Sequence, residues 1–202
     1  MNTVEQARAD LDYIRQTLEQ AGTFTTISGG GLAGAGAIGI AAAAVSAYWL
    51  RSSLSSPWRA QTFYPFLLIW IAAAALAIAT AGLGSVRKAR RWNLPLYRGP
   101  ARRALRCMAP GWVAAVLVTA ALVRRGAFEF VPAAWLLLDG LALLGAATFS
   151  IPPVRWMGWI LFSLGTLAAL VPDPWISVFA LAGGFGLLHL AAGIYIGRSD
   201  RE

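Results

Sequence analysis

Six long apolar runs, separated by short polar segments, dominate the pattern of this chain. A bilayer core about 30 Å thick is crossed by about 20 helical residues, which is close to the length of each run. Strands of a membrane β-barrel would alternate between polar and apolar residues, and these runs do not alternate. The pattern therefore predicts an all-α polytopic integral membrane protein with six transmembrane helices. The expected spans are residues 29–50, 62–84, 107–123, 128–150, 154–171 and 175–197.

The segment before the first run has an amphipathic pattern. From Val4 to Ala21, apolar residues recur every three or four positions, and residues 3–6 fit a capping box at a helix start. We expect residues 1–28 to form a cytoplasmic amphipathic helix and a linker. The apolar stripe of this helix either packs on the protein's own loops and on lipid headgroups or mediates dimerisation. The segment lacks the basic start of a cleavable signal peptide, so we expect the first span to be retained.

Composition excludes a soluble fold. Of the 202 residues, 58% are hydrophobic and only 13% are charged, and a soluble chain of this length could not bury so much apolar surface. The net charge is +8, and eight of the seventeen basic residues lie in the expected loop 85–106. Trp92 and Tyr97 lie among them, a mixture that also binds nucleic acids. Because this loop joins two spans, we expect contact with anionic lipid headgroups and no nucleic acid. The expected contact residues are Arg87, Lys88, Arg90, Arg91, Arg102 and Arg103.

The distribution of basic residues also predicts the orientation. With the N-terminus inside, thirteen basic residues fall on the cytoplasmic side and four on the other side. Short cytoplasmic loops of membrane proteins are enriched in Lys and Arg, so we expect both termini in the cytoplasm, with residues 198–202 as a cytoplasmic tail. Sixteen of the seventeen basic residues are Arg, which is typical of a GC-rich bacterial genome. We therefore expect a bacterial cytoplasmic (inner) membrane.

Glycine-rich faces of the first and last spans predict close helix packing. Gly30 and Gly34 form a small-xxx-small pair, and Gly186 and Gly193 lie on a face of small residues in the last span. In lipid, such faces let two helix backbones approach closely. The glycine run of the first span also has the spacing of a phosphate-binding turn, but that turn requires a preceding strand, and none is expected.

Two ionisable residues lie inside expected spans, where a charged side chain costs about 2.5–3.5 kcal/mol to insert. Asp139 is about 16 Å into the fourth span, and His189 is about 12 Å from the inner end of the sixth, at 1.5 Å per residue. These two helices run in the same direction, so the side chains can lie at similar depth. They form either a proton-titrating pair along a polar pathway or polar contacts that hold helices together. We favour the second interpretation.

Residues typical of enzymes are scarce. Cys107 and His189 are the only cysteine and histidine, so His-rich and all-cysteine zinc sites are excluded. Asp139 and His189 could form a triad with Ser150 or Ser163, but the chain has no nucleophile-elbow motif. We expect no enzyme, no metal site and no cofactor.

Proline recurs at three expected helix starts, in Phe63-Tyr64-Pro65, Phe130-Val131-Pro132 and Pro174-Trp175. Three helical hairpins would explain this repeat, and so would the general preference for proline in a first turn. With six spans, this length and a last hairpin ending GGFGLLHLAAGIYIGR, the layout resembles the acid-resistance membrane protein family, small bacterial proteins built from three hairpins. The amphipathic segment 3–21 and the Arg-rich loop depart from that architecture. The resemblance implies an envelope or stress role and assigns no catalytic residue.

These observations lead to one favoured function and one alternative. We expect a non-catalytic integral membrane protein that assembles with itself, as a homo-oligomer, or with partner membrane proteins. The alternative is a small proton-linked transporter or channel that uses Asp139 and His189.

Overall fold

The computed structural model describes residues 6, 8, 10–14, 27–52, 58–91 and 100–199, and these residues form helices and no strand. The first helices are α2 (Gly29–Ser52), α3 (Ala60–Arg91) and α4 (Pro100–Arg125). A 3-10 turn, η1 (Phe128–Phe130), then leads into α5 (Val131–Ala147), which is followed by α6 (Pro152–Leu170). The last span consists of α7 (Pro174–Leu181), a π-helical segment η2 (Ala182–Leu188) and α8 (His189–Ser199). Six of these helical segments are long and apolar enough to cross a membrane, as expected.

Little of the expected amphipathic helix lies within the described residues. Residues 6, 8 and 10–14 are helical, and Leu11 and Ile14 of the apolar stripe are exposed. The remainder of segment 3–21, including the capping box, lies outside the described residues.

Proline and one carboxylate define several helix starts. Pro132, Pro152 and Pro174 each lie in the first turn of a helix, where the missing N–H costs no hydrogen bond. Asp173 caps α7, because its side chain accepts from the backbone N–H groups of Trp175 at 2.8 Å and Ile176 at 3.0 Å. Pro65 differs from these prolines, since α3 begins at Ala60 and Pro65 lies inside it.

The third span and the basic loop differ from expectation. Helix α4 has 26 residues and begins at Pro100, whereas the apolar pattern predicted a short span from 107 to 123. Likewise α3 continues to Arg91. Seven of the eight basic residues expected in the loop are therefore helical. A helix can continue beyond its apolar run until a residue such as glycine ends it.

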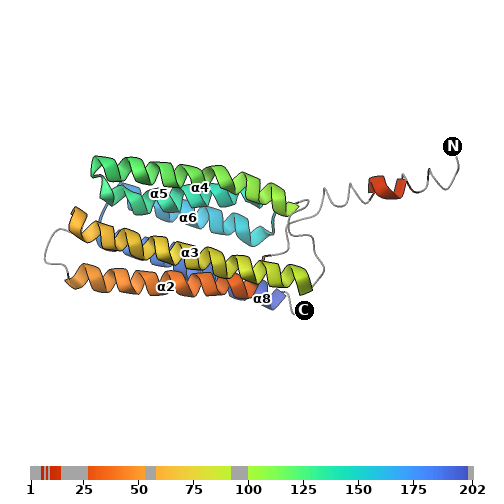
Figure 1. The fold of residues 1–202 in the computed structure, drawn as a ribbon, viewed down its shortest axis with the longest axis horizontal. Helices are drawn as coiled ribbons and strands as arrows, with labels where there is room; N and C mark the ends of the chain where they lie inside the picture. Colours follow the sequence, from red (N-terminus) through yellow and green to blue (C-terminus); the bar gives the residue numbers. More distant parts are fainter. Residues whose placement is uncertain are drawn as a thin grey trace.

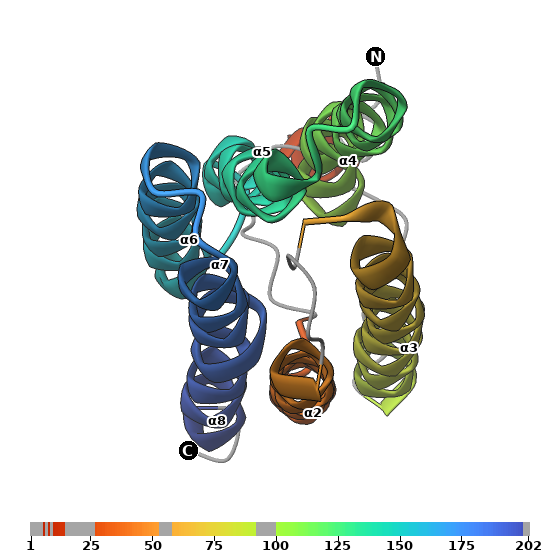
Figure 2. The same ribbon diagram turned by 90° about the vertical axis from the view of Figure 1, so that its left-hand side faces the viewer.

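The helices form two layers, with α2, α3 and α8 in one and α4, α5 and α6 in the other (Figure 1). Helix α5 packs along both α4 and α6, and α2 packs along both α3 and the last span. In three hairpins, α6 and the last span would be each other's main partners. The last span contacts α2 more extensively than it contacts α6, and the division into three hairpins therefore stays a prediction. Viewed end-on, α4 lies at the edge of its layer, on the same side of the bundle as α3 (Figure 2).

The apolar core lies in one half of the bundle. We call the end where α3 finishes and α4 starts the basic end, since both helices carry arginines there. The core cluster lies toward the opposite end and includes Phe63, Leu136, Leu161 and Leu181, all fully buried. Phe63 stacks on Phe128 with ring centroids 4.5 Å apart. The last residue that α3 contributes to this cluster is Ala73. The half of α3 nearest the basic end therefore lies outside the core cluster.

Candidate functional site

Asp139 is bound to an indole from the neighbouring helix. The Trp112 Nε1–H on α4 donates to Oδ1 of Asp139 on α5 at 3.0 Å. Asp139 is half-buried, and 39% of Trp112 remains exposed. This partner could not be predicted from the sequence, because helical spacing identifies neighbours on one helix and Trp112 lies on another. The only signal in the sequence was a tryptophan inside an apolar run, a residue that needs a hydrogen-bond acceptor when it leaves water.

His189 is held by the backbone of its own helix. Its Nδ1 lies 2.9 Å from the carbonyl oxygen of Gly184, and its ring centroid lies 6.0 Å from that of Phe185. A carbonyl oxygen only accepts hydrogen bonds, so Nδ1 must carry the proton in this contact. In the neutral imidazole the lone pair is therefore on Nε2.

The fold brings Asp139 and His189 into the same region of the bundle. The two groups are close enough to interact electrostatically. The described residues show no direct hydrogen bond or ion pair between them, since Trp112 is the partner of Asp139 and Gly184 the partner of His189. Each of the two groups thus has its own separate hydrogen-bond partner.

The π-helical segment Ala182–Leu188 lies directly before His189. It includes two consecutive glycines, Gly183 and Gly184. π-helical turns are rare and occur frequently at functional sites. Here the extra residue in the turn brings the Gly184 carbonyl opposite the imidazole, five residues later in the chain.

Other indole groups make similar contacts between helices. Trp135 on α5 donates to the Thr119 hydroxyl on α4 at 2.8 Å, and Trp70 on α3 donates to the Ser46 hydroxyl on α2 at 3.1 Å. The Trp112–Asp139 bond follows this pattern. Interhelical hydrogen bonds of this type contribute about 0.6–2 kcal/mol each in a membrane. This repetition supports a role of Asp139 in holding α4 against α5.

Glycines form a closely packed seam between α2 and the last span. Some of the expected glycines lie in this seam and others do not. A Cβ placed on Gly36 would collide with the backbone of Leu190 and with the carbonyl oxygen of Gly186. A Cβ on Gly193 would collide with the backbone of Ala33. Gly34 faces α3 instead, where its Cβ would lie 2.8 Å from Cγ2 of Thr80. Gly30 contacts no other helix, because its Cβ would meet no atom within 4 Å. Of the expected pair, Gly34 therefore packs on α3 and Gly30 does not pack on another helix, while the contact of α2 with the last span is made by other glycines, including Gly36.

The basic residues expected at lipid headgroups lie at the ends of α3 and α4. Arg87, Arg90, Arg91 and Arg102 are exposed. Two others have partners within the protein. Lys88 donates to the carbonyl oxygen of Ile27 at 3.0 Å, and the Arg103 guanidinium lies 5.9 Å from the centre of the Phe149 ring.

We call the side of the bundle formed by α3 and α4 the α3–α4 side. Few of its residues are buried by other helices. From Leu105 to Arg125, α4 has no buried residue, and it packs chiefly against α5 (Figure 2). Between Ala74 and Arg91, α3 has one buried residue, Ala89, and its packed face lies against α2. The Trp112–Asp139 pair is therefore only partly covered in the single chain, through the exposed part of the Trp112 indole.

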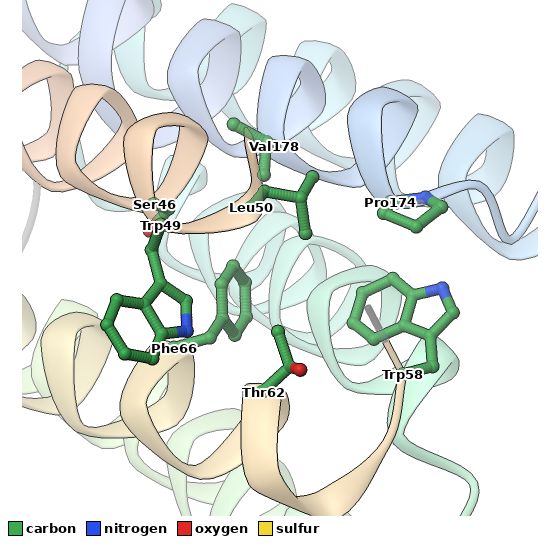
Figure 3. A pocket seen from close by; sticks show the side chains of 8 residues that line it. All are labelled: Ser46, Trp49, Leu50, Trp58, Thr62, Phe66, Pro174 and Val178. Carbon is green, nitrogen blue, oxygen red and sulfur yellow. The ribbon is translucent and has the colours of Figure 1, made fainter. Parts of the chain in front are cut away.

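A small cavity lies at the end opposite the basic end, between α2, α3 and the start of α7 (Figure 3). Trp49, Trp58 and Phe66 line it, and its volume is about 10 Å³, which is room for one water molecule. Within the described ranges, no group of three His, Cys, Asp or Glu residues could hold a metal ion.

No protein-family model, curated protein or solved structure matches this chain.

Proposed function

We propose that this protein is a non-catalytic integral membrane protein that assembles with itself or with partner membrane proteins through its α3–α4 side. In this proposal it lies in the bacterial inner membrane with both termini in the cytoplasm, as the excess of basic residues in the expected cytoplasmic segments favours. The observation that carries the proposal is the Trp112–Asp139 hydrogen bond inside a membrane-crossing region, with 39% of Trp112 exposed and Asp139 half-buried.

Assembly would remove an unfavourable contact between polar groups and lipid. A carboxyl group facing hydrocarbon costs several kcal/mol, and lipid tails offer it no hydrogen bond. A helix from a partner or a second copy can cover the pair and add a donor to the second carboxylate oxygen. Side chains near Trp112 favour such contact, since Val116 lies one turn away and is 70% exposed.

Photo-crosslinking in native membranes tests this proposal. We expect a benzoylphenylalanine placed at Val116 to give protein adducts, and the same group at Ile160 on α6 to give few. Ile160 is a fair control because it is also exposed and lies at a similar distance from the end opposite the basic end. Replacing Asp139 by Leu should reduce the adducts at position 116. Equal yields at both positions, or adducts that do not depend on Asp139, would contradict the proposal.

A second candidate function is proton-linked transport or conduction. The location of Asp139 and His189 in the same region of the bundle favours it, together with the π-helical turn that presents the imidazole. In this alternative, Nε2 of His189 and the free carboxylate oxygen of Asp139 exchange protons along a path through the bundle.

Proton flux into liposomes separates the two candidates. If the second one holds, purified protein should collapse an imposed pH gradient, and Asp139→Asn and His189→Gln should each remove most of that flux. Thr166→Val is a suitable control, since the Thr166 hydroxyl donates only to Phe162 of its own helix. A flux that survives Asp139→Asn would exclude the carboxyl group as a proton carrier.

A further inference from the structure

Exposed arginines lie at the basic ends of both α3 and α4. Arg87, Arg90 and Arg91 are exposed in the last turns of α3, and Arg102 and Arg106 are exposed in the first turns of α4. Neither helix contains an Asp or a Glu, and only eight residues separate Arg91 from Pro100. Both helix ends lie at the same end of the bundle (Figure 1), and neither helix carries a carboxylate that could neutralise these arginines.

Apolar faces of α3 and α4 extend from this positive region into the membrane. On α3, helical spacing places Ile71, Ile78 and Gly82 on the face that carries Tyr64. Ile78 is 67% exposed, and a Cβ on Gly82 would meet no atom within 4 Å. The face therefore has exposed apolar surface over several helical turns, from the arginines toward the end opposite the basic end.

The matching face of α4 is also uncovered near the basic end. Leu105 and Val116 share a face with Val123 by helical spacing, and Leu105 is 50% exposed. At the other end of the bundle Val123 packs on the core cluster, whereas the Tyr64 ring lies 6.1 Å from the Phe128 ring and stays 48% exposed. The face of α4 is thus packed at the end opposite the basic end and uncovered at the basic end, and the face of α3 is exposed at both.

We propose that a phospholipid with an anionic headgroup binds on the α3–α4 side at the basic end. Its phosphate is held by arginines from both helices, and its acyl chains lie against the exposed faces of α3 and α4. A guanidinium binds phosphate oxygens in a bidentate fashion, and basic sites between membrane helices on the cytoplasmic side typically take anionic lipids. Charge complementarity therefore selects an anionic lipid, and the apolar faces select a molecule with chains.

The proposed lipid site does not depend on the proposed assembly. Acyl chains offer no hydrogen bond to Asp139, so they do not satisfy the polar pair, and a partner that covers Val116 would displace the chains from that part of α4. Binding can also be measured on the purified chain alone, which makes failure of one proposal distinguishable from failure of the other.

Thermal-shift titration of the purified full chain in detergent tests the lipid site. We expect phosphatidylglycerol to raise the Tm in a saturable manner, and phosphatidylcholine and free glycerol 3-phosphate to have no effect. Combined Arg102→Gln and Arg106→Gln substitutions should weaken phosphatidylglycerol binding about tenfold or more. Arg124→Gln and Arg125→Gln, at the opposite end of the same helix, are the matched control and should change it less than about twofold.

A second variant tests the apolar part of the site. Gly82→Leu keeps every charge and fills the free surface of α3, so it should weaken phosphatidylglycerol binding while leaving the Tm of the lipid-free protein unchanged. The proposal is overturned if phosphatidylcholine binds equally well, if the control pair weakens binding as much as Arg102 and Arg106 do, or if Gly82→Leu has no effect.

Discussion

Gly36→Ala should lower the free energy of unfolding of this protein by about 3 kcal/mol or prevent the membrane domain from folding. The added Cβ would lie 2.7 Å from the carbonyl oxygen of Gly186 and 2.7 Å from Cα of Leu190, in addition to meeting the Leu190 nitrogen. All of these are backbone atoms, so no side-chain rotation relieves the collision. The last span would have to move away from α2, which would separate other contacts along the seam, including those of Gly193.

Gly30→Ala is the matched control for this experiment. It makes the same chemical change in the same helix, but its Cβ meets no atom within 4 Å. Since alanine is a better helix former than glycine by about 1 kcal/mol, Gly30→Ala should be neutral or slightly stabilising. Unfolding by sodium dodecyl sulfate titration, followed by tryptophan fluorescence, measures both variants. Equal stability of the two would show that α2 and the last span do not pack through Gly36.

Phe63→Ala should have the second large effect, a loss of about 3–5 kcal/mol. Phe63 is fully buried, stacks on Phe128, and lies 6.2 Å from the ring of Phe66. Between helices in lipid the lost energy is mainly packing, since lipid tails are as apolar as the core. The variant therefore measures the cavity left in the core cluster.

Phe179→Ala serves as the control, because 67% of Phe179 is exposed and its ring contacts only Trp175 among the ring contacts found in the described part of the chain. We expect a loss of less than about 1 kcal/mol, as for other substitutions away from a core. The same detergent titration compares the two phenylalanine variants. A similar loss in both would mean that the core cluster does not stabilise the bundle more than contact with lipid does.

The candidate site was predicted in its residues but only partly in its geometry. Asp139 and His189 were identified because a polar group among twenty apolar residues has a high cost and therefore needs a partner. The partner of Asp139 proved to be Trp112, and the partner of His189 proved to be a carbonyl of its own π-helical turn. Neither could be derived from spacing, since one depends on the rotation of α4 against α5 and the other on an irregular turn.

The sequence by itself determined the six helices that are long and apolar enough to cross a membrane, and the proline starts at Pro132 and Pro174, because these depend on composition and on local backbone chemistry. Only the tertiary structure decided which glycines form the seam. Gly30 and Gly36 are equally suitable for close packing in isolation, and the rotation of α2 about its own axis selects Gly36. That rotation depends on all contacts of α2 with α3 and the last span, so it cannot be predicted from the local sequence of α2. The same reason explains why the α3–α4 side, with its partly covered polar pair and its arginines, became apparent only in three dimensions.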